Sequence, residues 1–512
     1  MSPSPRARRR IVVCSAWILG LALALTLPLL PGVLAGPAAE SPDPPQDQPQ
    51  QPGKKKKDKK KKDKKKKDKK APQPEAADPQ KAAAEKEAEE EKRGGRFRFV
   101  MAKRPSIRVR KVARADFRVK SQLDFSSFLP KNPSERQPGE GLLDLHRMRV
   151  GVEGNFLKHF EYEFEYELRD RLADVLGIDP TEVQHPWRDA WVNFRYLRDF
   201  QIRAGKFKIP FSRDQLTGPT NLDFAFRSRL ASQLAPARDI GIVAHGRFFR
   251  RALSYEAGIF KQDGENAEFT DDEPEVAVRT GSGLRTFAGR VTGEPLRYLG
   301  VPKALRRLEL GGAFASTTVP QGLRSLRGRM ATGETFFPRF FVHGHRLRIG
   351  TELNWEPGPF SLRGEFVHVS EERRGQSLAG RDLPNLVSRG WYLSGSWVVT
   401  GEKKQGGVEP RKDFLLERGL GAVELAGRWE ALRFGSAQHL GRPLRIERAS
   451  NVLGNSDRAW TVGVNWYWNR HIKIQFNAIR ERIEDFEESR RRTPLLGHPI
   501  YWTRLCRVQF VL

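Results

Sequence analysis

The sequence predicts an all-β protein: a transmembrane antiparallel β-barrel of about sixteen strands that follows a disordered N-terminal tail. Between Phe160 and Leu168, aromatic and aliphatic residues alternate with four glutamates. Alternate side chains of a strand point to opposite faces, so this strand has one apolar and one charged face. Similar windows recur from Gly94 to Leu512 between Gly, Pro, Asn and Asp turns, without a long amphipathic helical pattern. Residues 94–512 are therefore expected to form the barrel.

The first 35 residues are expected to be a signal peptide. Several arginines precede an apolar run from Ile11 to Leu30, and residues 33–35 resemble a cleavage site. A single membrane-spanning helix is the alternative, because the run has about the minimum length for spanning. Pro28, Pro31 and the cleavage-like site favour removal. The mature protein is then expected in the outer membrane of a Gram-negative-type (diderm) cell, in contact with outer-membrane lipid.

Residues 36–93 are expected to be a disordered tail, because they are rich in Pro, Gln, Lys, Glu and Ala and have almost no residues that could build a core. Within the tail, Lys54 to Lys70 contains fourteen lysines and three aspartates. Such a run repels itself and commonly serves as an interaction tail. A plain solvated spacer and a contact with anionic envelope polymers both remain open. An exported protein rarely meets nucleic acid, so no nucleic-acid partner is expected.

The strand register predicts which residues face the lumen. On the window Ile107 to Phe125, read as one strand, odd positions are largely apolar and even positions largely basic. The next window places His146 and Met148 on the lipid side. The candidates for an anion-conducting lumen are the basic residues of the polar faces: Arg108, Arg110, Arg114, Arg118, Lys120, Arg147, Arg149, Arg203, Arg346 and Arg348.

The charge balance favours an anion path. The chain carries a formal net charge of +29, and a positive lumen with low-dielectric walls concentrates anions. Rings of Arg or Lys are the usual device of anion and phosphate pores, and guanidinium matches the bidentate geometry of phosphate. The alternative is structural: the arginines pair across strands with carboxylates such as Glu163 and Glu165. Replacing Arg108, Arg110, Arg114 and Arg118 by Glu is expected to weaken or reverse the selectivity.

Catalytic motifs are absent from the sequence. It contains no GxSxG, HExxH, GxxxxGK[ST] or CxxC pattern, and its ten histidines lack the spacing of metal ligands. Neither a cofactor nor a metal site is expected, and the protein is not expected to be an enzyme. Two alternatives to a channel stay open: a barrel enzyme with an exposed Ser, His and acid near one rim, and a closed barrel that anchors the tail to the envelope.

Several segments resemble the phosphate-selective porin O and P family. They are DAWVNF (189–194), IRAGKFKIPFS (202–212) and PARDIGIV (236–243), and later WYLSGSWVVTGE (391–402), GAVELAGRW (421–429) and GVNWYWN (463–469). The resemblance covers most of 105–512. It implies a sixteen-stranded outer-membrane porin, usually a homotrimer, which passes phosphate, polyphosphate or related inorganic anions by passive diffusion.

The resemblance also implies that extracellular loops fold inward and form a constriction. The connection from Phe211 to Pro236 is the candidate here, because a loop of this length tends to be functional. Its candidate residues for the constriction are Arg213, Arg227 and Arg229. Two features depart from the family pattern. The segment 224–227 lacks the glutamate of a Phe-x-Glu-Arg element, and the chain ends on Leu512 instead of an aromatic residue.

Overall fold

The computed structural model describes residues 97–101, 104–110, 112–129, 142–169, 186–264, 285–331, 333–404, 407–414, 417–485 and 500–512. The signal peptide predicted at 1–35 and the tail predicted at 36–93, with its Lys54–Lys70 run, lie outside the described residues. No helix within the described residues has the length and apolar character that a membrane crossing requires.

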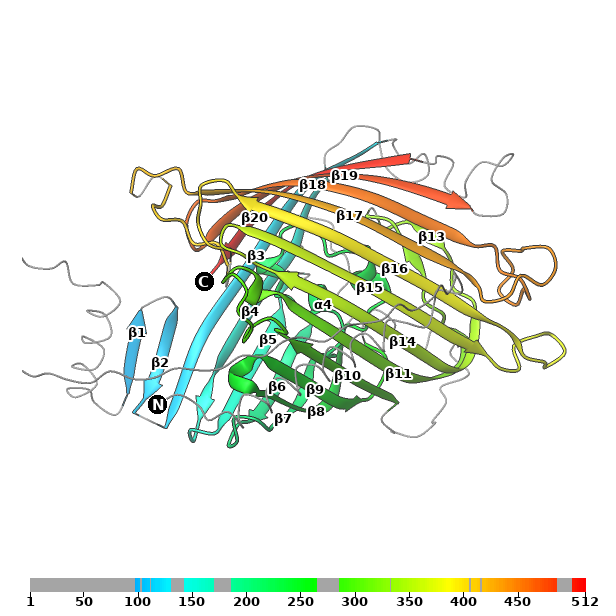
Figure 1. Ribbon diagram of the computed structural model, residues 1–512, viewed down its shortest axis with the longest axis horizontal. Coiled ribbons are helices and arrows are strands. Elements are labelled where there is room, and N and C mark those ends of the chain that lie inside the picture. The colour runs from blue at the N-terminus through cyan, green and yellow to red at the C-terminus, as the bar shows by residue number, and fades with distance from the viewer. Residues whose placement is uncertain are drawn as a thin grey trace, which may run out of the picture. The chain divides into compact units, whose positions relative to one another are not determined.

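Sixteen antiparallel strands form a closed barrel, which confirms the predicted fold (Figure 1). They are β3 (Ala113–Leu129), β4 (Leu142–Phe156), β5 (Phe160–Glu167), β6 (Trp187–Phe194), β7 (Gln201–Lys208), β8 (Arg238–Phe248), β9 (Leu253–Phe260), β10 (Thr286–Gly293), β11 (Glu309–Leu323), β14 (Phe341–Trp355), β15 (Phe360–Arg373), β16 (Leu383–Val398), β17 (Ala422–Ser436), β18 (Asn455–Tyr467), β19 (Ile472–Asp485) and β20 (Ile500–Val511). Each strand pairs with the next, and β20 pairs with β3. The pairing of β20 with β3 closes the ring, so these strands leave no unpaired edge.

A short hairpin precedes the barrel and corrects the prediction of one strand from Ile107 to Phe125. It consists of β1 (Arg98–Met101) and β2 (Pro105–Val109). The chain turns at Arg110, whose φ of 42° is incompatible with an extended strand. β2 then pairs with Ala113 to Asp116 of β3, beyond the point where β20 ends. The hairpin therefore extends the sheet past one end of the barrel.

The two ends of the barrel differ in their connections. At one end, the turns 157–159, 356–359 and 468–471 take only three or four residues. Three long connections, 209–237, 324–340 and 437–454, lie at the other end. The connection 399–421 and both described chain termini lie at the short-turn end. In outer-membrane barrels short turns are periplasmic and long loops extracellular.

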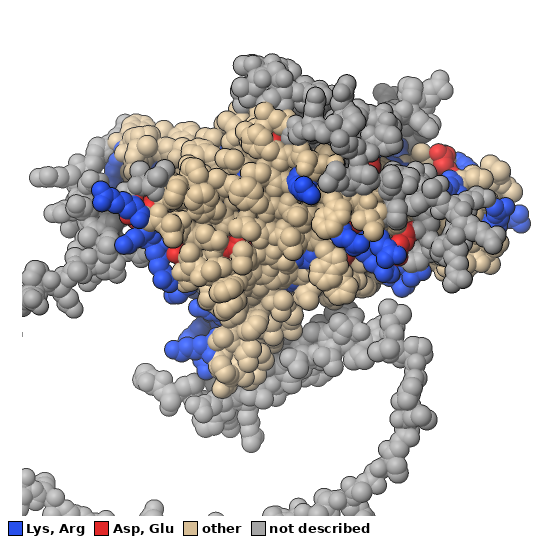
Figure 2. Space-filling view, turned by 90° about the horizontal axis from the view of Figure 1, so that it is seen from above, with Lys and Arg blue, Asp and Glu red and all other residues tan. Residues whose placement is uncertain are grey.

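The alternation predicted from Phe160–Leu168 is confirmed. Phe164 is 40% exposed on the outer face, whereas Glu165 is 2% exposed on the inner face. Later strands follow the same rule: Trp460 and Val462 of β18 are exposed, and Thr461 between them is buried. Figure 2 shows the result, a broad and mostly uncharged outer face with basic side chains gathered toward its two ends.

The barrel interior contains a hydrophobic core. Two inward-folded connections supply it. The connection 209–237 contributes Leu230 and Leu234, both 0% exposed, and the connection 324–340 contributes Phe337, whose ring stacks on Phe434 of β17 at a centroid distance of 4.8 Å. The second connection includes the small hairpin of β12 (Gly328–Arg329) and β13 (Thr335–Phe337). The core therefore fills part of the lumen, where these connections pack against wall residues of β7 to β11, β14 to β17, β19 and β20.

Candidate functional site

The connection 209–237, hereafter the inner loop, crosses the lumen. It holds two short helices, α4 (Arg213–Leu216) and α5 (Arg229–Gln233), whose N-caps Ser212 and Ser228 accept backbone hydrogen bonds. The inner loop was predicted to fold inward, and the structure places it there (Figure 1). Its carbonyl groups satisfy cations of the wall: Lys473 of β19 donates to Thr220 and Leu222, each at 3.0 Å.

Two predicted lumen arginines lie buried beneath the inner loop. Arg346 and Arg348 of β14 are 0% exposed. Both bind Asp263 of the connection after β9, and Arg348 also donates to the Leu234 carbonyl of the inner loop at 2.7 Å. A passing anion cannot reach them in this structure. Their prediction as conducting residues is therefore wrong, because the strand register identified the inward face but not the loop that covers it.

A cavity of about 560 Å³ remains between the inner loop and the strands β3 to β10. Seven cationic side chains line it: Arg118, Lys120, Arg203, Lys208, Arg213, Arg238 and Arg290. Glu163, Asp189 and Glu256 are its carboxylates, and Trp191, Phe207, Leu216 and Pro219 are its apolar residues. Cations thus outnumber carboxylates on the lining, and a low-dielectric wall strengthens their field.

Most of these cations are already paired with carboxylates. Arg118 binds Glu153, Glu163 and Glu165, and Lys120 also binds Glu165. The guanidinium of Arg238 contacts Asp189 at 2.7 Å. A carboxylate partner fixes the orientation of a cation and cancels part of the electric field that the cation exerts on an anion. The glutamates of β5 therefore hold basic residues in position, as the structural alternative expected.

Other cations are held by carboxylates of β11 and β14. Arg290 of β10 donates to both oxygens of Glu352, at 2.6 and 2.8 Å. Arg213 at the start of α4 binds Glu309 and also approaches Glu352 at 3.3 Å. The contacts of Arg213 attach the inner loop to β11 and β14.

Arg203 and Lys208 of β7 differ from the other cations. Among the contacts of the described residues, neither has a carboxylate within ion-pair distance. The Arg203 guanidinium lies over the Trp191 ring at 4.6 Å from its centroid, and its buried Nε has no hydrogen-bond partner. Lys208 donates to the Leu216 and Thr217 carbonyls at 3.1 and 2.9 Å. These two side chains can therefore bind an anion in the cavity.

The remaining predicted residues lie away from the cavity. Arg149 is 3% exposed and binds Glu165 and Glu167, and the neighbouring Arg147 donates to Gln122 of β3. Arg108 lies on β2, and Arg110 lies in the turn after it. Arg114 is half-exposed and binds Asp116 where β3 pairs with β2.

The other two loop candidates are structural supports. Arg227 donates to the Asp214 and Thr217 carbonyls within the inner loop, and its burial lowers its pKa to about 10. Arg229 binds Glu481 at 2.8 Å. Of the three predicted constriction residues, Arg213 alone lines the cavity. The two buried arginines instead fix the path of the inner loop.

Sequence reasoning missed three cations of the cavity. Lys208 and Arg238 stand in the segments that resemble the family, but the resemblance assigned them no role. Arg290 belongs to β10. Its alternation with Val291 and Thr292 is too short to give a clear signal. Which wall residues face the cavity also depends on the path of the inner loop through the lumen. The alternating pattern of a strand does not encode this path.

A second connection supports the inner loop from the short-turn end. Lys404, in the connection 399–421, binds Asp223 of the inner loop and Glu424 of β17. Burial opposes the charged form of Lys404, but Asp223 and Glu424 outweigh it and raise its pKa. Burial likewise acts to raise the pKa of Asp223, yet Lys404 and Arg363 hold it below its usual value. This contact is therefore fully formed from about pH 4 to about pH 10.

Replacing Lys404 with Met is expected to loosen the inner loop. The substitution leaves Asp223 buried with one fewer cationic partner, a situation that destabilises its surroundings. Single-channel recordings should show a several-fold increase in current noise at neutral pH. In the unmodified protein the same increase should appear only at acid pH, below the usual pKa of an aspartate, as Asp223 becomes protonated. Lys403→Met is the control, because Lys403 is exposed; equal noise in both variants would contradict the assignment.

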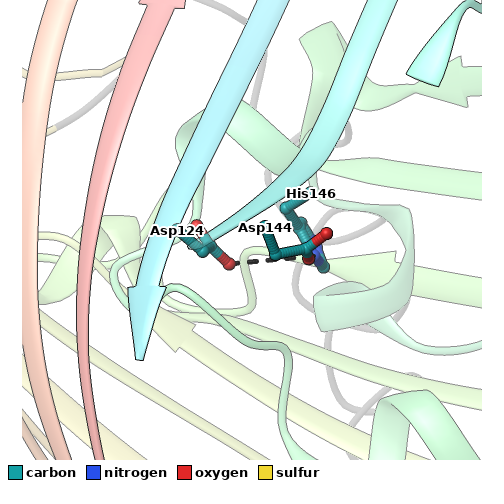
Figure 3. A group of neighbouring side chains, drawn as sticks. All are labelled: Asp124, Asp144 and His146. Atoms are coloured by element: carbon teal, nitrogen blue, oxygen red, sulfur yellow. Dashed lines mark ion pairs between the residues drawn. The ribbon is translucent and has the colours of Figure 1, made fainter. Parts of the chain in front are cut away.

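Asp124, Asp144 and His146 lie together at the long-loop end of the wall (Figure 3). A register shift between β3 and β4 turns His146 inward, which corrects its predicted lipid-facing position. The ligand atoms of the three side chains lie within 4.8 Å of one another. Arg507 of β20, however, donates to both oxygens of Asp124 at 2.6 Å. The group is therefore explained as an ion-pair network of the wall.

Comparison with known proteins gives one family and several distant relatives. The profile described as phosphate-selective porin O and P matches residues 116–494. An uncharacterized protein of Caulobacter vibrioides is 23% identical over 362 residues, covering 68% of this chain and 64% of the relative. Porin O of Pseudomonas aeruginosa is 24% identical over 139 residues, covering 26% of this chain and 30% of the relative. The chain thus matches less than two thirds of the length of either curated relative.

Solved outer-membrane proteins show weaker similarity. An anion-selective porin from Comamonas acidovorans is 11% identical with a TM-score of 0.45, covering 78% of this chain and 100% of that porin. OmpT, an outer membrane protein of Vibrio cholerae, is 8% identical with a TM-score of 0.46, covering 78% of this chain and 98% of its own.

Proposed function

Because this chain belongs to the phosphate-selective porin O and P family, we propose that it is an outer-membrane channel through which inorganic anions such as phosphate diffuse passively. The cavity beside the inner loop carries this proposal, since Arg203 and Lys208 face it without carboxylate partners in the described contacts. Guanidinium and ammonium groups are the usual binding groups for phosphate oxygens. Paired cations such as Arg118 add a weaker background field.

Planar-bilayer recording in a salt gradient tests this function. The unmodified protein is expected to give a reversal potential of anionic sign, because the lining of the cavity has a cationic excess. Adding phosphate to a chloride solution should reduce the chloride current as phosphate occupies the cavity. A reversal potential of cationic sign would overturn the proposed preference, whatever the conductance.

The same recording separates the two other functions. A closed barrel with esterase activity would indicate an enzyme, and a closed, inert barrel would indicate an anchor. The cavity favours the channel, because its lining carries an excess of cations, which suits an anion path. We also propose a homotrimer, as the family resemblance implies. Native mass spectrometry of the detergent-solubilised protein would distinguish a trimer from a monomer.

We further propose that residues 1–35 are removed on export and that the Lys54–Lys70 run contacts anionic envelope polymers. Fourteen lysines in seventeen residues supply a dense positive charge. The mature protein is expected to co-sediment with an anionic cell-wall polymer at low salt, and to be released as salt screens the charges. A variant without 54–70 should remain in the supernatant; equal sedimentation of both proteins would mean that the run is only a spacer.

A further inference from the structure

Two pairs of arginines lie directly opposite each other on the outer face of the barrel. Arg389 of β16 is the register partner of Arg433 of β17, and Arg458 of β18 is the partner of Arg482 of β19. Like charges in directly opposed positions destabilise a sheet. The four side chains are exposed. These four residues, hereafter the arginine patch, therefore concentrate positive charge that attracts an anion.

The arginine patch faces the membrane side of the wall and not the lumen. Arg458 lies two residues from Trp460, and both are on the outer face of β18. The lumen-facing positions on either side of these two residues, Asp457 and Thr461, are each 1% exposed. The pore field and the arginine patch are thus on opposite faces of the same sheet.

A row of tryptophans fixes the depth of the arginine patch. Trp429 of β17 stacks on Trp460 at 5.0 Å between centroids, and Trp391 of β16 meets Trp429 edge-on at 4.8 Å. Aromatic residues gather where the hydrocarbon region meets the headgroups. Arg389, Arg433 and Arg458 each follow the tryptophan of their own strand toward the long-loop end, by two to four residues. This spacing places them at headgroup level.

The charge of this face is strongly one-sided. Along the outward positions of the described strands β16 to β20, there are six arginines and one carboxylate, Glu484. Glu484 is shared by Arg482 at 2.8 Å and Arg458 at 3.6 Å. The Nε of Arg389 donates a hydrogen bond to Nδ1 of His368 at 3.2 Å. Charged side chains on a lipid-facing surface are costly unless they lie near an interface with an anionic partner.

We propose that the arginine patch binds a multiply phosphorylated lipid headgroup of the outer leaflet. Guanidinium pairs with phosphate in a bidentate manner, and two opposed arginine pairs offer a site for each of two phosphates on one headgroup. The tryptophan row then packs against the acyl chains below the headgroup. The lipid surrounds the barrel and leaves the lumen open, so this inference is independent of the anion selectivity.

The test uses the full-length protein in detergent, with bisphosphorylated lipid A and its dephosphorylated form as probes. Two variants remove one pair each, Arg389→Gln/Arg433→Gln and Arg458→Gln/Arg482→Gln. The matched control is Arg198→Gln/Arg247→Gln, since both of its arginines are exposed at the short-turn end. Binding is measured by native mass spectrometry, and thermal unfolding is followed with and without each lipid. Retained channel conductance verifies that each variant is folded.

The bisphosphorylated lipid is expected to bind the unmodified protein and the control, and to bind each pair variant at least tenfold more weakly. The dephosphorylated form should bind all four proteins equally weakly. Without lipid, the pair variants should unfold at about the same temperature as the unmodified protein, because exposed ion pairs contribute little to stability. Undiminished binding of the bisphosphorylated lipid by both pair variants, or an equal loss in the control, would overturn the proposal. So would a change of oligomeric state with lipid binding unchanged, since the patch would then join copies of the chain.

Discussion

Replacing Asp263 with alanine is expected to lower the free energy of unfolding by about 3–5 kcal/mol, the usual cost of breaking a buried ion pair by removing one partner. Asp263 binds both Arg346 and Arg348, and all three residues are 0% exposed. Burial acts to raise the pKa of Asp263, but Arg348 and Arg346 hold it below its usual value. Without the carboxylate, Arg346 keeps Glu371, whereas Arg348 keeps only the Leu234 carbonyl among the described contacts.

The loss can be measured by urea unfolding of the detergent-solubilised barrel. Asp382→Ala is the control, because Asp382 is exposed and accepts a hydrogen bond from Gly375 at 2.7 Å. Adding Arg348→Met to Asp263→Ala should recover part of the loss, since an apolar side chain of similar length needs no counter-charge. Equal stability of Asp263→Ala and the control would mean that water reaches the two guanidiniums.

Features of the wall could be predicted because they are local and periodic. The stripe from Phe160 to Leu168 alternates without interruption, and the structure places its glutamates inward and its aromatic rings outward. The same two-residue period gave the exposed face of β18. It failed at Arg110 and His146, where a turn and a register shift interrupt the alternation. Single residues with unusual backbone angles leave no periodic signal.

The covering of the inner wall could not be read from the strands. Arg118 and Arg348 both occupy inward positions, but Arg118 lines the cavity while Arg348 lies beneath the inner loop. The difference is set by contacts between residues far apart in the chain, such as Arg348 with Asp263 and Lys404 with Asp223. The sequence indicated that the inner loop would fold inward. Which strands it would cover depends on these distant ion pairs.

The double variant Arg203→Glu/Lys208→Gln is expected to abolish or reverse the anion preference of the channel. It removes the two cavity cations that have no carboxylate partner among the described contacts and adds one negative charge. In a narrow, low-dielectric space such a change alters the local ion concentration by a factor on the order of 10 or more. The ratio of anion to cation permeability, taken from the reversal potential, should fall by at least that factor.

A matched control makes this experiment specific to the cavity. Arg108→Glu/Arg110→Gln changes the net charge equally, but on the β1–β2 hairpin outside the barrel ring. It should leave the permeability ratio within about twofold, because neither arginine lines the cavity and salt screens distant charges. We therefore expect the ion selectivity to depend on Arg203 and Lys208 of β7 and not on Arg108 and Arg110.

Lys208 also holds the inner loop through two carbonyls, so Arg203→Glu alone should still produce most of the shift in the permeability ratio. A permeability ratio that follows the hairpin variant and not the β7 variants would place the selective region at the periplasmic mouth.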